Sequence, residues 1–200
     1  MHQTYLAVKL CNAILQQAPN TSSTVSSVIL PQCLSLLSSS LLQGLALDAV
    51  LQLFGTMGKH LSFDNLLESL VNISHKKSEQ EMARGSYAII AQCIATLVQS
   101  APAAKQQSTV ARFIEGVKKG KNDGDHLLSI YSLGEIGRRI DLSSNPEIKQ
   151  ALLSCFEFSS EDIKSAASVA FGGLAVGNLE KYLPEILAEV NSQPKRQYLL

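Results

Sequence analysis

The stretch SAASVAFGGLAVGNLEKYLPEIL, from Ser165 to Leu187, decides the fold. Small or apolar residues recur at intervals of three and four from Ile163 to Leu174, which is the pattern of one face of an α-helix. The preceding SSED offers N-cap hydroxyls and first-turn acids. Gly177 and Asn178 then supply a stop that tolerates left-handed backbone. A second helix is expected from about Lys181 to just before Pro194.

The glycines of this stretch have two interpretations. A phosphate-binding loop needs a strand before its glycines and a helix after them, whereas here a helical pattern runs through Gly172 and Gly173. We therefore interpret them as small residues that let stacked helices approach closely. We expect Gly172 to lie at this boundary, where a leucine would overpack it and lower the melting temperature.

The preceding segment repeats the same helical hairpin. Leu133 and Gly134 align with Phe171 and Gly172, and Pro146 aligns with Pro184, so that two separate landmarks give the same offset of 38 residues. The pattern continues upstream less strictly. Helix pairs with a period of about 40 residues are typical of HEAT repeats, whereas tetratricopeptide and ankyrin repeats are shorter and armadillo units use three helices.

The fold class predicted is therefore all-α, a HEAT-repeat α-solenoid of about five helix pairs stacked as a right-handed superhelix without a sheet. We expect residues 1–200 to form a single array. The expected repeats are 2–38, 41–74, 82–119, 125–157 and 161–192, with the start of a further helix at 195–200. Because the first helix begins at once with apolar residues and the chain stops at KRQYLL, we interpret it as a slice of a longer solenoid.

Composition excludes several classes of protein. Hydrophobic residues make up 46% of the chain, and 17 basic residues balance 17 acidic ones, which argues against nucleic acid or an anionic membrane as partner. No apolar run is long enough to span a bilayer, and the first 15 residues lack a secretory leader pattern. We expect a protein of the cytoplasm and nucleus. The four cysteines, none in a CxxC pair, are expected to be buried and reduced: Cys11, Cys33, Cys93 and Cys155.

No motif for catalysis or metal binding is visible in the sequence. There is no HExxH motif, no paired metal ligands and no GxSxG elbow. The four histidines are interpreted as surface or capping residues, Ser38 to Ser40 as a linker between helices, and Glu79 and Glu81 as acids that favour a helix N-terminus. We expect no enzyme, no cofactor, no metal and no small-molecule substrate.

Three segments carry a family resemblance along essentially the whole chain. LLSIYSLGEIGRRIDLS, the stretch EDIKSAASVAFGGLAVGNLEKYLPEILAEVNSQPKRQYLL and, more loosely, SSLLQGLALDAVLQLFG resemble the cullin-associated NEDD8-dissociated proteins. The similarity is strongest from Leu127 onward and is to a segment in the C-terminal half of a much longer HEAT-repeat chain.

The resemblance implies a function without catalysis. Members of the family wrap around cullin scaffolds that lack NEDD8, together with the RING subunit. They compete with adaptor–substrate-receptor modules and so act as exchange factors for SCF-type and other cullin–RING ubiquitin ligases. Much of the superhelix lies outside these 200 residues, so a curved piece of the binding arch is the expectation here.

The contact candidates come from two considerations. The second helix of each pair usually lines the concave partner face of such a solenoid, and these helices are expected at Ser23–Ser38, Phe63–Ile73, Gln107–Lys119, Pro146–Glu157 and Lys181–Ser192. Their candidate contact residues outside the core are Asn65, Glu68, Arg112, Glu115, Lys149, Gln150 and Glu189. Two basic spots at helix ends, Lys118–Lys119 and Arg138–Arg139, have two interpretations: compensation of the helix dipole, or an electropositive rim for an acidic partner.

Other functions stay open as alternatives. A generic HEAT scaffold or an importin-like transport adaptor has the same architecture, and the SLGEIG…IDLS…VGNLEKYLP series is what favours the cullin-associated family. Nucleic-acid binding would need a larger basic surplus than a net charge near zero supplies.

Overall fold

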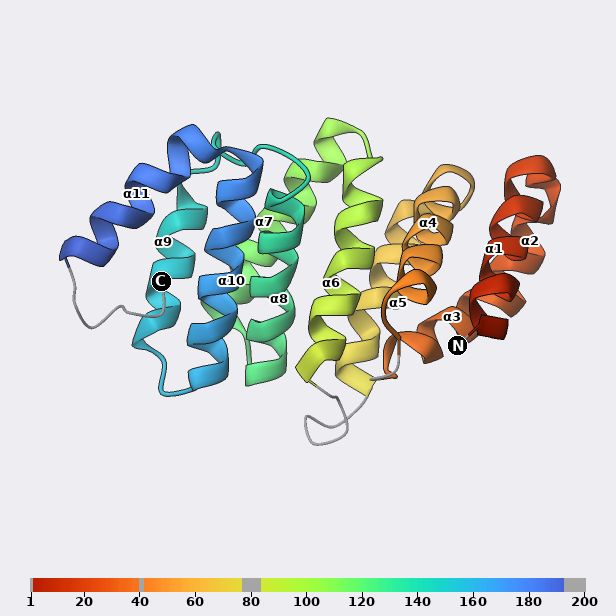
Figure 1. Ribbon diagram of the computed structural model, residues 1–200, viewed down its shortest axis with the longest axis horizontal. Helices are drawn as coiled ribbons and strands as arrows, with labels where there is room; N and C mark the ends of the chain where they lie inside the picture. Colours follow the sequence, from red (N-terminus) through yellow and green to blue (C-terminus); the bar gives the residue numbers. More distant parts are fainter. Residues whose placement is uncertain (1, 40–41, 77–83, 193–200) are drawn as a thin grey trace. The chain divides into compact units, whose positions relative to one another are not determined.

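The computed structural model describes residues 2–39, 42–76 and 84–192, and the described residues are helical without a strand. The fold is all-α and built of helical repeats, as predicted (Figure 1). The expected acids Glu79 and Glu81 and the further helix at 195–200 lie outside the described residues. The chain has two compact units, Met1–Pro102 and Ala103–Leu200, and the boundary falls between the two helices expected to form the third repeat.

The first unit places α1, α4 and α6 side by side (Figure 1), with α5 in contact with α6 and α3 in contact with both α5 and α6. A continuous helical segment from Pro19 to Leu37 replaces the single helix expected at Ser23–Ser38, and it contains a π-helical turn at Val25–Ile29. Pro31, the second residue of α3, lacks an N–H for the carbonyl four residues back, which lies inside this turn. The elements are α1 (His2–Gln17), η1 (Pro19–Thr21), α2 (Ser22–Thr24), η2 (Val25–Ile29), α3 (Leu30–Leu37), α4 (Leu45–His60), α5 (Phe63–Lys76) and α6 (Arg84–Gln99).

The second unit packs α8 against α10, with α7 and α9 behind them and α11 after α10. Two of its second helices begin earlier than expected, α7 by four residues and α11 by two. Pro146 is the N-cap of α9, whereas the aligned Pro184 lies inside α11. The elements are α7 (Ala103–Lys119), α8 (Asp123–Gly137), α9 (Glu147–Ser154), η3 (Cys155–Glu157), α10 (Glu161–Gly177) and α11 (Leu179–Ser192).

Local signals in the sequence start and end these helices. Asn122 caps α8, because its Oδ1 accepts a hydrogen bond of 2.8 Å from the Asp125 N–H. Helix α10 ends at Gly177 as expected, but Asn178 has a φ of −150°, so the predicted left-handed stop is wrong. Asn178 instead begins the next helix, where its Oδ1 accepts from the Lys181 N–H at 3.1 Å.

Helix α8 is buried on nearly every side because it lies between α7 and α10. One of its buried residues is His126, with an exposed fraction of 7%. The His126 Nδ1 lies 3.1 Å from the Val117 carbonyl oxygen, and its ring packs edge-on against Phe158. The expectation that every histidine lies at the surface or caps a helix is therefore wrong for His126.

Backbone-to-backbone contact joins α8 to α10. A Cβ added at Gly134 would lie 2.6 Å from the Cα of Ala170, and one added at Gly173 would collide with the Gly134 carbonyl. A Cβ on Gly177 would likewise collide with the Gly137 carbonyl. Only glycine fits at these crossings, since any side chain would push the helices apart.

Gly172 does not take part in this crossing. A Cβ there would meet no atom within 4 Å, so the expectation that Gly172 lies at the occupied repeat boundary is wrong for this chain. The reason is helical geometry: consecutive residues differ by about 100° around the axis. Gly173 therefore faces α8 while Gly172 faces away from it.

We expect Gly173→Ala to lower the free energy of unfolding by about 1–3 kcal/mol, because the added methyl group forces α8 and α10 apart. Gly172→Ala is the matched control, and it should raise stability by up to about 1 kcal/mol through helix propensity alone. Urea unfolding followed by far-UV circular dichroism measures both variants. Equal stability of the two variants would contradict this geometry.

The four cysteines show how well the helical core excludes solvent. All four are free thiols; Cys33, Cys93 and Cys155 are buried and Cys11 is half-buried. Burial raises the pKa of the Cys33 thiol to about 11, with a smaller contribution from Cys11, and burial raises the pKa of Cys155 to about 12. Since the thiolate is the reactive form, these thiols are protected both sterically and by protonation.

We expect alkylation at pH 8 to modify Cys11 first and the three buried cysteines only slowly, because burial blocks access to all three and the raised pKa of Cys33 and Cys155 leaves few thiolates there. Mass spectrometry of peptides after timed iodoacetamide treatment identifies the modified site. The same reaction in urea should label all four at similar rates. Early labelling of Cys155 in the folded chain would show that the core around α9 is open.

Candidate partner-binding face

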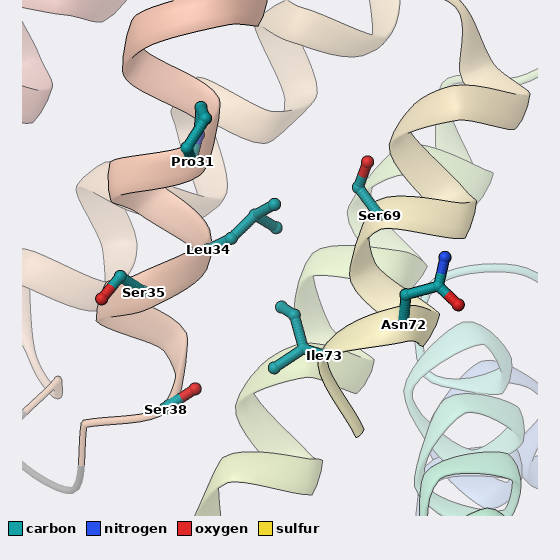
Figure 2. Close-up of a pocket in the computed structure, with 7 residues that line it drawn as sticks. All are labelled: Pro31, Leu34, Ser35, Ser38, Ser69, Asn72 and Ile73. Atoms are coloured by element: carbon teal, nitrogen blue, oxygen red, sulfur yellow. The ribbon is translucent and has the colours of Figure 1, made fainter. Parts of the chain in front are cut away.

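The second helices carry the candidate contact face, described here for each unit by itself. In the first unit, α3 and α5 are separated by a groove of about 380 Å³. Figure 2 shows Leu34 of α3 and Ile73 of α5 pointing toward each other across it. The remaining lining is uncharged: Pro31, Ser35, Ser38, Ser69 and Asn72.

Helical periodicity aligns this lining. Pro31, Leu34 and Ser38 recur on one face of α3, and Ser69, Asn72 and Ile73 on one face of α5. Ile73 is 9% exposed and forms the apolar floor. The groove can accept an apolar side chain between uncharged hydrogen-bonding groups, which is how small recognition pockets are commonly built.

The sequence candidates of the first unit lie beside this groove but do not line it. Asn65 and Glu68 are exposed on α5. Only the Asn65 backbone is bonded within its helix in these two contacts: its N–H donates to the Ser62 Oγ at 3.4 Å and its carbonyl accepts from the Ser69 hydroxyl at 2.7 Å. Sequence reasoning missed the groove itself, although the i, i+3, i+4 spacing of small polar residues among leucines was the available signal.

In the second unit, grooves of about 360 Å³ and 300 Å³ lie between α7 and α9. Lys118 of α7 and Glu147 of α9 line the first of them, and their Nζ and Oε2 atoms form an ion pair of 2.5 Å. The candidates Gln150 and Glu115 also line these grooves. Arg112 is exposed on α7.

A second ion-pair group links α9 to α11. The Lys149 Nζ lies 3.6 Å from a carboxylate oxygen of Glu185 and 3.6 Å from one of Glu189. The structure thus brings two sequence candidates, Lys149 and Glu189, into direct contact. Their partner Glu185 was not among the predicted residues, although it occupies the same repeat position as Glu147.

The two basic spots each face carboxylates of this chain. Lys119 pairs with Glu115 at 2.6 Å, and this hydrogen bond lowers the pKa of Glu115 and raises that of Lys119. Arg139 and Arg138 both reach Glu135, at 2.6 Å and 3.5 Å. The basic side chains at both spots are thus paired with acids of this chain, and their role as partner contacts stays a prediction.

Loops between consecutive repeats are joined by a polar network. Asp141 accepts hydrogen bonds from the Ser143 N–H at 2.8 Å and from the Asn178 side chain at 3.0 Å. Lys181 forms a further hydrogen bond across the same boundary, because its Nζ donates to the Ser143 carbonyl at 3.0 Å. The bond from Ser143 is the main cause that lowers the pKa of Asp141, opposed by desolvation.

The described residues show neither a metal-ligating cluster nor a helix with the length and apolarity that crossing a bilayer requires. What the described geometry offers is shallow grooves and surface ion pairs, which suit contact with a macromolecule.

Comparison with known proteins gives the family. A protein named cullin-associated NEDD8-dissociated protein 1 from Arabidopsis thaliana is 41% identical over 209 residues that cover 100% of this chain. The protein of the same name from Dictyostelium discoideum is 35% identical over 98% of this chain. This chain belongs to the cullin-associated NEDD8-dissociated protein family.

The chain spans about one-sixth of the length of the curated relatives it matches, namely 17% of the Arabidopsis protein and 16% of the Dictyostelium protein. A more distant relative, from Emericella nidulans, is 25% identical over 80% of this chain and is named cullin-associated NEDD8-dissociated protein 1, C-terminal part. No family model matches the chain.

We expect native stability to fall as pH drops below about 4, because the folded state holds the Asp141 carboxylate in its charged form. The folded pKa lies below the ordinary value of 3.8, so this contribution is present above pH 3.8 and is lost as pH falls through the lower folded value. Asp141→Asn should flatten that part of the profile. Urea midpoints between pH 3 and 6 measure it, and identical profiles for both proteins would contradict the assignment.

Proposed function

We propose that this chain is a non-catalytic, cullin-binding part of an exchange factor for cullin–RING ubiquitin ligases. The observation that carries the proposal is the similarity along the whole chain to proteins named as cullin-associated and NEDD8-dissociated. The chain covers only about one-sixth of those proteins, so it supplies part of a larger contact surface. The match to a relative named as a C-terminal part supports the expected place in the C-terminal half.

The second-helix faces suit this role physically. The groove between α3 and α5 is uncharged and has an apolar floor, so an apolar side chain of the partner gains burial there without desolvating a charge. The face of the second unit is charge-balanced through its ion pairs, which favours polar contacts at the rim of an interface. The eleven sequence candidates remain proposed contacts, and we add Leu34 and Ile73 to them.

We propose that the partner is the cullin together with its RING subunit, in the form that lacks NEDD8. The expected consequences are regulation of SCF-type ligase assembly and exchange of substrate receptors in the cytoplasm and nucleus. Small molecules, nucleic acid and membranes are not expected to be ligands.

Pull-down of immobilised chain with unmodified or NEDD8-modified cullin–RING complex tests the proposal. We expect preferential retention of the unmodified form. Equal retention of both forms would remove the proposed link to NEDD8. Retention of neither would leave the generic scaffold or the transport adaptor as the better explanation of the fold.

Leu34→Glu should weaken cullin binding at least about tenfold, because it places a charge in the groove opposite its apolar floor. Leu45→Glu is the matched control, since Leu45 is 69% exposed on α4 and outside the groove. Both variants should keep the native circular dichroism spectrum. If the two variants bind equally well, the α3–α5 groove is not part of the interface.

A further inference from the structure

The two grooves between α7 and α9 are formed by facing rows of side chains. On each helix the lining residues recur at intervals of three and four, which places them on one face. Because Glu147 lines both grooves and pairs with Lys118, this ion pair lies at the boundary between the groove of about 300 Å³ and the groove of about 360 Å³. The rows include Ala111, Ile114 and Lys118 on α7 and Glu147, Gln150 and Ser154 on α9.

The groove of about 300 Å³ combines apolar surface with two carboxylates. Ile114, which is 6% exposed, forms its base, and Ala111 and Pro146 add further apolar lining. Glu115 of α7 and Glu147 of α9 line the groove from opposite helices, and their side chains are 53% and 67% exposed. Among the described residues, those that line this groove include no basic side chain. A cationic side chain that enters the groove therefore meets two accessible carboxylates above an apolar base.

Two lysines outside this groove hold its carboxylates in place. Lys118 pairs with Glu147 at 2.5 Å and Lys119 pairs with Glu115 at 2.6 Å, in both cases through the Oε2 atom of the carboxylate. The Oε1 atom of each carboxylate is therefore available to a further donor. The hydrogen bond from Lys119 also lowers the pKa of Glu115, which favours its ionised form. The acceptors are thus oriented before a ligand arrives, which reduces the entropic cost of binding.

The chemistry of the groove favours arginine over lysine. A guanidinium group is planar and has five N–H donors, so it can bond to two carboxylates at once, whereas an ammonium group is a compact and more strongly hydrated charge. The aliphatic stem of an arginine can lie along Ile114 while its head reaches Glu115 and Glu147. The groove between α3 and α5 has an uncharged lining and therefore suits a different kind of side chain (Figure 2).

We propose that the groove lined by Ile114, Glu115, Pro146 and Glu147 binds an arginine side chain of a partner protein. The two carboxylates accept hydrogen bonds from the guanidinium group, and the methylene stem covers Ile114. The inference rests on the proposed role of the second helices as the contact face. It adds the chemistry of the partner residue that this part of the face selects.

Titration with short peptides, followed by NMR of the isoleucine methyl groups, tests the proposal. The probes are acetyl-Gly-Arg-Gly-amide and the same peptide with citrulline, whose side chain is close in shape to arginine but uncharged. We expect the arginine peptide to shift the Ile114 methyl signal saturably and to bind at least about tenfold more tightly than the citrulline peptide, because citrulline makes no charge-assisted hydrogen bond. A lysine peptide should bind more weakly than the arginine peptide.

The double variant Glu115→Gln, Glu147→Gln should lose the preference for arginine over citrulline. Glu180→Gln is the matched control, since Glu180 is exposed on α11 outside the groove and its replacement also removes one carboxylate charge. Both variant chains should keep the native circular dichroism spectrum, because the substituted side chains are exposed. Equal affinity for the arginine and citrulline peptides, the absence of a saturable shift, or an unchanged preference in the double variant would overturn the proposal.

The peptide titration contains no cullin, so it separates this inference from the proposed function. If the cullin–RING complex is retained in the pull-down but the arginine peptide does not bind, this inference fails and the proposed function stands. If the arginine peptide binds with the expected preference but the complex is not retained, the arginine site stands and the proposed function fails.

Discussion

The contact of the α8 and α10 backbones at Gly134 and Gly173 is the constraint on which the second unit depends. Helices whose side chains interdigitate lie 8–10 Å apart, and glycine on both sides permits a closer approach. Once the axes are that close, α8 becomes buried on nearly every side. The loops at the ends of the two helices are then near enough for Asp141 to reach Asn178.

The same closeness explains why the second helices meet through ion pairs. Because α8 and α10 fix the spacing of successive repeats, α9 and α11 are held at a distance that a lysine can span. Lys149 reaches two glutamates of α11, and Lys118 reaches Glu147 across the groove behind α8. Exposed pairs of this kind contribute little to stability, on the order of 0–1 kcal/mol each. Their main effect is to leave the face without a large uncompensated charge.

Much of the fold could be predicted from periodicity and offset alone. The helices, their approximate bounds and the helical-repeat class follow from apolar spacing and from landmarks such as Gly134 and Pro146. Sequence could not distinguish Gly172 from Gly173, because both fit the helix and only the rotation of α10 about its axis decides which one faces α8. Likewise His126 resembles a polar helix-end residue, yet the carbonyl of Val117 and the ring of Phe158 provide it with a buried site. The candidate contact residues lie on exposed or half-buried positions and stay predictions, whereas an ion-pair partner such as Glu185 lies on another helix and can be identified only from the tertiary structure.

The burial of α8 also has a consequence for the order in which the second unit opens. In stacked repeats each hairpin touches only its neighbours, so local unfolding begins at the helices with the fewest packed neighbours. Helix α8 has packed helices on several sides, whereas α11 keeps one apolar side in solvent. We therefore expect the amide protons of α8 to exchange with solvent deuterium later than those of α11.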